Sequence, residues 1–71
     1  MNPRFYTLAD VAEVLNISMS ATRALVHSGD LPAIQIGGKN AWRVEATELE
    51  AFIQRQYELT RQRIKSGELQ A

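Results

Sequence analysis

Apolar side chains recur near the start of the chain at the spacing of one helix face. The residues at these i, i+3, i+4 and i+7 positions are Leu8, Val11, Ala12 and Leu15. This spacing gathers them on a single stripe of a helix. Thr7 and Asp10 resemble a capping box, in which each side chain accepts a backbone N–H from the other residue. The pattern therefore predicts a helix over about residues 7–15.

A second helix is predicted after the short turn at residues 16–18. Ser18 can accept the first free backbone N–H groups of this helix, and Gly29 can supply a left-handed cap at its end. The side expected to face the first helix carries Thr22, Leu25 and Val26. The opposite side is small and polar, and it carries Ser20, Arg23, Ala24 and His27. This polar face is either ordinary solvated surface or a surface kept small enough to enter a groove.

From Leu31 onward the pattern alternates with a period of two, which is typical of strands. Two such runs flank the turn-forming residues 37–40, Gly-Gly-Lys-Asn. We therefore expect a hairpin with about four loop residues. An isolated hairpin is only marginally stable in water, so its apolar side chains should pack against the helices. These side chains are Ile34, Ile36, Trp42 and Val44.

A third helix is predicted over about residues 46–66. Thr47 and Glu50 form a second candidate capping box, and Gly67 stands just past the expected end. The apolar stripe of this helix consists of Leu49, Phe52, Ile53, Tyr57, Thr60 and Ile64. At 1.5 Å per residue the helix spans roughly 30 Å. The rest of so small a chain is too short to cover the whole stripe, so we expect part of it to stay uncovered.

Composition narrows the class of protein. The chain has 71 residues, 45% of them hydrophobic, which predicts one folded domain. It has no cysteine and one histidine, so we expect no disulfide, no metal site and a reducing intracellular compartment. No apolar run approaches the roughly 20 residues of a membrane span, and the first five residues do not resemble a signal peptide.

The charge balance opposes a nucleic-acid partner at first sight, because eight basic residues stand against eight acidic ones. The charges are nevertheless segregated along the chain. Between residues 20 and 43, Arg23, Lys39 and Arg43 stand against Asp30 alone, which leaves a local balance of +2. Zero net charge therefore does not exclude DNA, and it predicts modest, salt-sensitive binding.

The order of elements predicts a DNA-binding architecture rather than an enzyme. Two short helices joined by a three-residue turn form a helix-turn-helix, and the following hairpin forms a wing. Residues 37–39 do not match a phosphate-binding loop, which needs an earlier glycine and a Ser or Thr after the lysine. No nucleophile and base stand out as a pair either. We predict that the protein is not an enzyme and needs no cofactor.

Several segments also carry a resemblance to a known family. They are residues 6–18, residues 25–39, Trp42-Arg43-Val44, and residues 49–53. They resemble the excisionase-type winged helix-turn-helix family, a small MerR-like branch, over about residues 5–53. The resemblance implies a mostly α fold with a small β-hairpin, with a DNA-binding domain at residues 1–53. A long C-terminal helix would then continue into a helical extension of the same domain at residues 54–71.

The resemblance also implies how such a domain binds double-stranded DNA, with the second helix in the major groove and the wing beside it. The candidate DNA-binding residues are Ser18, Ser20, Thr22, Arg23, His27, Lys39, Asn40 and Arg43. Arg23 is the one long donor on the polar helix face, so it is the first candidate for a guanine or phosphate contact. Lys39 and Arg43 are expected to bind phosphate from the wing.

The C-terminal extension lies outside the resemblance and allows three interpretations. Residues 54–66 carry four cations against Glu58, a local balance of +3. The segment is either a solvated helix, a dimer contact, or a further contact to the DNA backbone. The residues proposed for the last two roles are Arg55, Tyr57, Arg61 and Ile64.

We therefore predict a small cytoplasmic, nucleoid-associated bacterial or phage protein that binds double-stranded DNA in a sequence-directed way. Its role would be that of a transcriptional regulator, an excisionase-like factor or an architectural factor, acting as a homodimer or as a cooperative array on DNA. The alternative is a protein-interaction module of the same fold that docks a recombinase, polymerase or toxin partner and makes little DNA contact.

Overall fold

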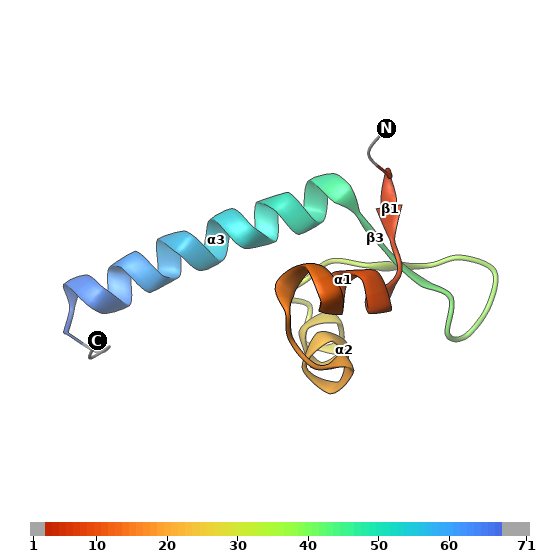
Figure 1. Cartoon of the computed structure of the whole chain (residues 1–71), viewed down its shortest axis with the longest axis horizontal. Coiled ribbons are helices and arrows are strands. Elements are labelled where there is room, and N and C mark those ends of the chain that lie inside the picture. The colour runs from red at the N-terminus through yellow and green to blue at the C-terminus, as the bar shows by residue number, and fades with distance from the viewer. Residues whose placement is uncertain (1–2, 68–71) are drawn as a thin grey trace.

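The computed structural model describes residues 3–67 of the chain. Its elements in chain order are β1 (Phe5–Tyr6), α1 (Leu8–Leu15), α2 (Met19–His27), β2 (Ile34–Gln35), β3 (Trp42–Glu45) and α3 (Ala46–Lys65). Figure 1 shows α1 and α2 at the centre, with the loop between β2 and β3 on one side and α3 extending to the other. The predicted mostly helical fold with a small antiparallel sheet is confirmed. Residues 1–2 of the predicted DNA-binding domain and residues 68–71 of the predicted C-terminal extension lie outside the described residues.

Both predicted caps at the start of α1 and α2 are present. The hydroxyl of Thr7 accepts the N–H of Asp10 at 3.0 Å, and the Asp10 carboxylate accepts the N–H of Thr7 at 3.1 Å. The hydroxyl of Ser18 accepts the N–H of Ala21 at 3.0 Å. Beyond α2, Gly29 has a φ of +84°, the left-handed conformation expected there. These local contacts fix where the two helices begin and how the chain turns between them.

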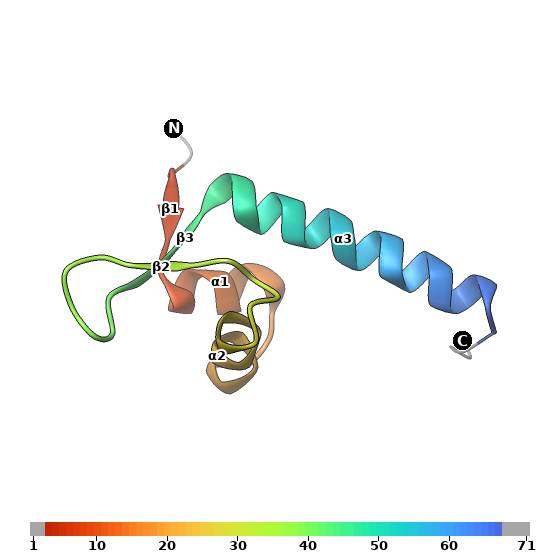
Figure 2. The same cartoon turned by 180° about the vertical axis from the view of Figure 1, so that it is seen from behind.

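The sheet has three strands in the order β1-β3-β2, all antiparallel. Strand β1 was not predicted, because two residues are too few to show a periodic pattern. It pairs Tyr6 with Val44, which places the N-terminal segment beside β3. Figure 2 shows the segment of β2 passing in front of α1 and crossing β3 before the loop extends away from the helices.

The predicted burial of Ile34 and Ile36 is wrong, since each side chain is about half exposed. Gln35 pairs directly with Trp42, and directly paired residues of an antiparallel ladder point to the same face. Ile34 therefore shares the outer face with Arg43, its own partner in the register. The cause is the loop of four residues. An even number of loop residues pairs each odd-numbered position of one strand with an even-numbered position of the other. Gln35, not the two isoleucines, shares the inner face with Trp42.

The core lies where α1, α2, β3 and the first half of α3 meet. Its buried apolar residues are Leu8, Val11, Val26, Leu31, Val44, Leu49 and Phe52. Thr22 joins this core with no exposed surface, and its hydroxyl donates to the carbonyl of Ser18 at 2.9 Å. Because that hydrogen bond satisfies the buried hydroxyl, Thr22 can pack against α1 without an energetic penalty. Trp42 is partly buried against the same cluster.

Helix α3 starts without the predicted capping box of Thr47 and Glu50, which is a second error. Glu45, at the end of β3, is the N-cap residue and makes no side-chain capping bond. The strand runs directly into the helix, and the N–H of Ala46 donates to the carbonyl of Arg4 at 2.7 Å. Arg4 also forms an ion pair with Glu45 at 3.1 Å. The start of α3 is therefore held by the segment next to β1 rather than by its own side chains.

The second half of α3 extends away from the core (Figures 1 and 2). Leu49 and Phe52 in its first half are buried, whereas the side chains of Tyr57 and Ile64 are 59% and 60% exposed. This confirms that the rest of the chain covers only part of the apolar stripe. Among residues 3–67, no helix is long and apolar enough to cross a membrane.

Candidate nucleic-acid interface

A groove of about 370 Å³ separates the polar face of α2 from the wing, by which we mean residues 34–45. Five predicted DNA-binding residues line it together: Arg23, His27, Lys39, Asn40 and Arg43. They come from α2, from the loop of the wing and from β3, so the fold gathers positions that are up to 20 residues apart in sequence. The start of α1 closes one side of the groove through Thr7, Leu8 and Ala9.

The polar face of α2 is free of bulky apolar side chains. All four of its members, Ser20, Arg23, Ala24 and His27, are exposed. The predicted packing side of the same helix is turned inward, with Thr22 and Val26 buried. The helix therefore exposes its polar face to solvent and buries its packing side, as the sequence pattern predicts.

The groove is positively charged by its composition. Arg23, Lys39 and Arg43 line it, and none of the lining residues is acidic. Within residues 3–67 the ion pairs are Arg4–Glu45 and Arg61–Glu58, so none of these three cations is neutralised by a described carboxylate. The guanidinium of Arg43 instead donates to the carbonyl of Trp42 at 2.8 Å. Three cations in the lining of one groove attract a polyanion, and the lining offers no competing anion.

His27 is held by an aromatic contact rather than by a carboxylate. Its ring meets Trp42 edge to face, with centroids 6.0 Å apart and an angle of 80° between the ring planes. Such a T-shaped pair is a favourable arrangement of aromatic rings. The contact joins the last residue of α2 to the first residue of β3, and it therefore links the helix to the wing.

Three candidate residues lie outside the groove lining. Thr22 is fully buried and its hydroxyl donates to the carbonyl of Ser18, so its side chain presents no surface to a ligand in the groove. The same sequence pattern had placed it on the packing side of α2, and packing prevails. Ser18 is exposed, and although its oxygen caps α2, its own O–H stays able to donate. Ser20 is exposed at the first turn of α2.

Two residues of the hairpin that line the groove, Gln35 and Trp42, were missed as site residues. The Nε2 atom of Gln35 donates to the carbonyl of Lys39 at 2.6 Å. Both side chains lie on the inner face because the hairpin register pairs them directly. The predicted four-residue loop already implied this register, so the sequence contained the signal that would have found them.

The residues proposed for the extension split into two kinds. Arg55 donates to the carbonyl of Asp30 at 3.1 Å, and Arg61 pairs with Glu58 at 3.0 Å, so both cations contact this chain itself. Tyr57 and Ile64 are exposed. An apolar hollow of about 260 Å³ lies beside Tyr57 and is lined also by Leu15, Phe52 and Ile53. The second half of α3 therefore offers apolar surface, with Arg63 and Lys65 as exposed cations near its end.

Within residues 3–67, no three side chains of His, Cys, Asp or Glu come close enough together to hold a metal ion. A family model described as a helix-turn-helix domain matches residues 5–57, which is most of the chain. No curated protein and no solved structure is similar enough to this chain to count as a match.

Proposed function

Since the chain belongs to the excisionase-type helix-turn-helix family of DNA-binding domains, we propose that it binds double-stranded DNA in a sequence-directed way. In this proposal α2 enters the major groove and the wing lies on the flanking backbone. The observation that carries it is the groove between them, which is lined by three cations that pair with no carboxylate of residues 3–67 and by no acidic residue.

The dimensions of the elements agree with this proposal. An α-helix with its side chains is about 10–12 Å wide, and the major groove of B-DNA is about 12 Å wide. The polar face of α2 carries small side chains around one long donor, Arg23, which can reach a base edge. Ser20 is placed to assist it. Lys39 and Arg43 lie on the wing side, where they can neutralise phosphates and fix the position of the helix.

The salt dependence of duplex binding tests the proposal. Each neutralised phosphate contributes about −0.9 to the slope of log affinity against log salt concentration. Three groove cations predict a slope of about −2 to −3 for one bound copy. Failure to bind any duplex at low salt would contradict the proposal. A specific duplex and a random duplex of equal length should differ in affinity, because only the former offers the base contact to Arg23.

We further propose that the protein acts in the bacterial cytoplasm on the nucleoid, as a transcriptional regulator, an excisionase-like factor or an architectural factor. Domains of this family are typically not enzymes, and the absence of catalysis in this chain stays a prediction. A map of the protein on its own chromosome would separate these roles. A regulator should occupy promoters, an excisionase-like factor should occupy recombination sites, and an architectural factor should occupy many dispersed positions.

We also propose that two copies associate through the C-terminal part of the apolar stripe of α3, which consists of Ile53, Tyr57, Thr60 and Ile64. These residues are spaced by four, three and four positions, as in the seam of a coiled coil. An antiparallel pair would place Ile64 of one copy in the hollow beside Ile53 of the other. It would also separate the cationic ends of the two helices, which a parallel pair would bring together.

Analytical ultracentrifugation of two matched variants tests this association. Ile64→Asp puts a charge into the stripe, whereas Leu59→Asp puts the same charge on another side of the same helix. The wild type and Leu59→Asp should sediment as dimers, and Ile64→Asp as a monomer. Should the wild type stay monomeric without DNA and bind long duplexes cooperatively, an array on DNA would replace the dimer.

The alternative function, a protein-interaction module, has one observation in its favour. Ile34 and Ile36 are exposed on the outer face of the sheet, beside the partly buried Phe5. Gln35 and Trp42, which line the groove, lie on the opposite face of the hairpin, and Arg43 is the one residue that both shares the outer face with Ile34 and lines the groove. An Ile34→Ser, Ile36→Ser variant should bind duplex as the wild type does if DNA is the partner. Loss of biological activity with intact DNA binding would favour the interaction module.

A further inference from the structure

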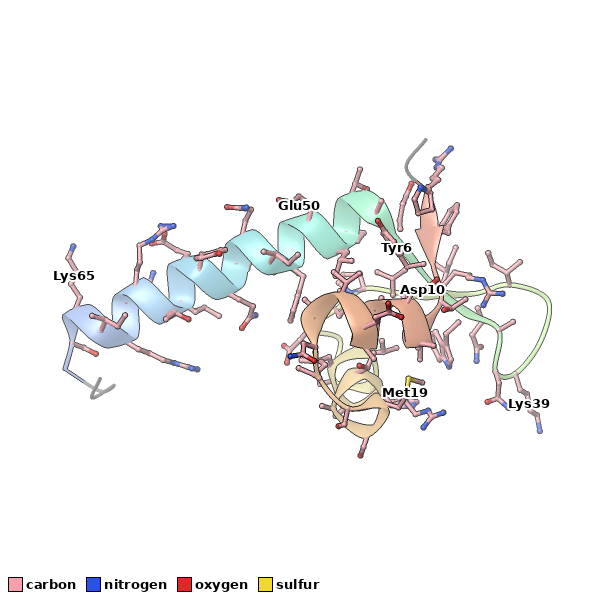
Figure 3. All side chains as sticks on the ribbon, in the orientation of Figure 1. Tyr6, Asp10, Met19, Lys39, Glu50 and Lys65 are labelled. Carbon is pink, nitrogen blue, oxygen red and sulfur yellow. The ribbon has the colours of Figure 1, made fainter. Side chains whose placement is uncertain are left out.

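The loop of the wing needs a specific restraint if Lys39 is to occupy one position. Its residues 37–40 include two glycines, and Gly37 adopts a φ of +82°. The backbone bonds at its base are short-range: the N–H of Ile36 donates to Ala41 at 2.9 Å, and the N–H of Ala41 donates to Gly38 at 3.3 Å. Figure 3 shows Lys39 at the far tip of this loop. Glycine-rich loops lose much conformational entropy when they are ordered.

Gln35 supplies a restraint at the right place. It stands on β2, opposite Trp42, with its side chain on the face that lines the groove. Its Nε2 atom donates to the carbonyl of Lys39 at 2.6 Å. Among the described residues, this is the one side-chain hydrogen bond made to residues 37–40. The bond therefore closes the loop on itself and fixes the backbone of the residue that carries the cation.

The restraint continues from the loop to α2. Trp42, which pairs with Gln35 in the register, contacts His27 at the end of α2. Trp42 also packs on the core. A continuous series of contacts thus connects the wing tip to α2. It consists of the hydrogen bond of Gln35, the cross-strand pair of Gln35 with Trp42, and the aromatic pair of Trp42 with His27.

We infer that Gln35 is a positioning residue, whose bond to the Lys39 carbonyl holds the wing tip at a fixed distance from α2. This inference rests on the proposed function, because it concerns how a phosphate contact by Lys39 is set up. Ordering the loop before binding lowers the entropy lost when the complex forms. Gln35 itself does not contact DNA in this account.

The variant that tests the inference is Gln35→Met, which keeps the length of the side chain and removes the donor. Gln54→Met is the matched control, because the Nε2 atom of Gln54 also donates an exposed hydrogen bond, to Glu50 at 3.1 Å. Gln35→Met should weaken duplex binding about threefold to tenfold, as expected for one lost hydrogen bond, and Gln54→Met should leave it unchanged. Equal affinities of the wild type and Gln35→Met would overturn the inference.

A second measurement separates positioning from a direct contact or a general loss of structure. In the Lys39→Ala background, Gln35→Met should cost nothing further, because there is no longer a cation to position. A full additional loss in that background would overturn the inference. Thermal unfolding of Gln35→Met should match that of Gln54→Met, since both residues are exposed.

A third measurement works without DNA and so stands apart from the proposed function. NMR relaxation of the backbone amides should show greater motion of Gly38, Lys39 and Asn40 in Gln35→Met than in the wild type, with α2 unchanged. Unchanged relaxation would overturn the inference. If the wild type binds no duplex but the loop still loses order in Gln35→Met, the proposed function and the role of Lys39 fail together, while the loop restraint itself remains.

Discussion

Two regions of the molecule, residues 20–43 with three cations and residues 54–66 with four, use them differently. At the wing end, Arg23, Lys39 and Arg43 line one groove and are paired with no described carboxylate. Along α3, Arg55 donates to a carbonyl of its own chain and Arg61 pairs with Glu58, while Arg63 and Lys65 have no described carboxylate partner. The local charge balance is +2 for residues 20–43 and +3 for residues 54–66, so the charge count alone would favour α3 over the proposed site. The convergence of charge in a groove distinguishes them.

The largest expected difference between the two ends concerns folding stability. Leu31 is fully buried, and Leu31→Ala should lower the free energy of unfolding by about 2–5 kcal/mol because it leaves a cavity. Ile64 is 60% exposed, and Ile64→Ala should lower it by less than about 1 kcal/mol. Urea unfolding at a protein concentration below dimer formation measures both. Equal losses would mean that the second half of α3 belongs to the folding core.

The next effect concerns base recognition by the groove. Arg23→Ala should weaken binding to the preferred duplex by about 1–3 kcal/mol and flatten the preference among duplexes that differ at one base pair. Arg61→Ala is the matched control at the other end, because this arginine is already paired with Glu58. Titration of a selected duplex and its single-base variants measures both affinity and preference. If Arg61→Ala costs as much as Arg23→Ala, the assignment of the DNA-facing surface is wrong.

The helices and their caps could be predicted because the signals are local. Thr7 with Asp10, and Ser18, lie within three residues of the backbone groups that they cap. The start of α3 near residue 46 was predicted correctly, but the contact that holds it was not, because the carbonyl of Arg4 lies 42 residues away and reaches it only through β1. Pattern within one element is visible in sequence, whereas pairing between distant elements is not.

The errors in the candidate site have a similar origin. Alternation alone did not tell which face of the hairpin is inner, and this choice assigned Ile34 and Ile36 to the core. The register of the hairpin, with Gln35 opposite Trp42, corrects the assignment and adds both residues to the groove. Thr22 shows a different difficulty. A threonine can contact a phosphate or be buried with its hydroxyl hydrogen-bonded, and residue type alone does not separate the two.

A smaller effect is expected from the cation at the wing tip. Lys39→Ala should weaken binding to all duplexes alike, without changing the order of preference, because a phosphate contact carries no sequence information. The slope of log affinity against log salt concentration should become shallower by about 1. Binding titrations at four or more salt concentrations measure this slope. A change in base preference in Lys39→Ala would place the wing tip on base edges instead of phosphate.

The smallest effect should come from the free cations at the far end of α3. Arg63 and Lys65 are exposed, and Lys65 lies at the opposite end of the molecule from Lys39 (Figure 3). The principal axis of the molecule is 45 Å long, well beyond the Debye length of about 10 Å at 0.1 M salt, so charges at the far end act weakly on a ligand in the groove. The variant Arg63→Gln, Lys65→Gln should therefore change the affinity for a short duplex by less than about 0.5 kcal/mol. The same titrations decide this, and a slope that falls by about 2 would extend the DNA interface along the whole of α3.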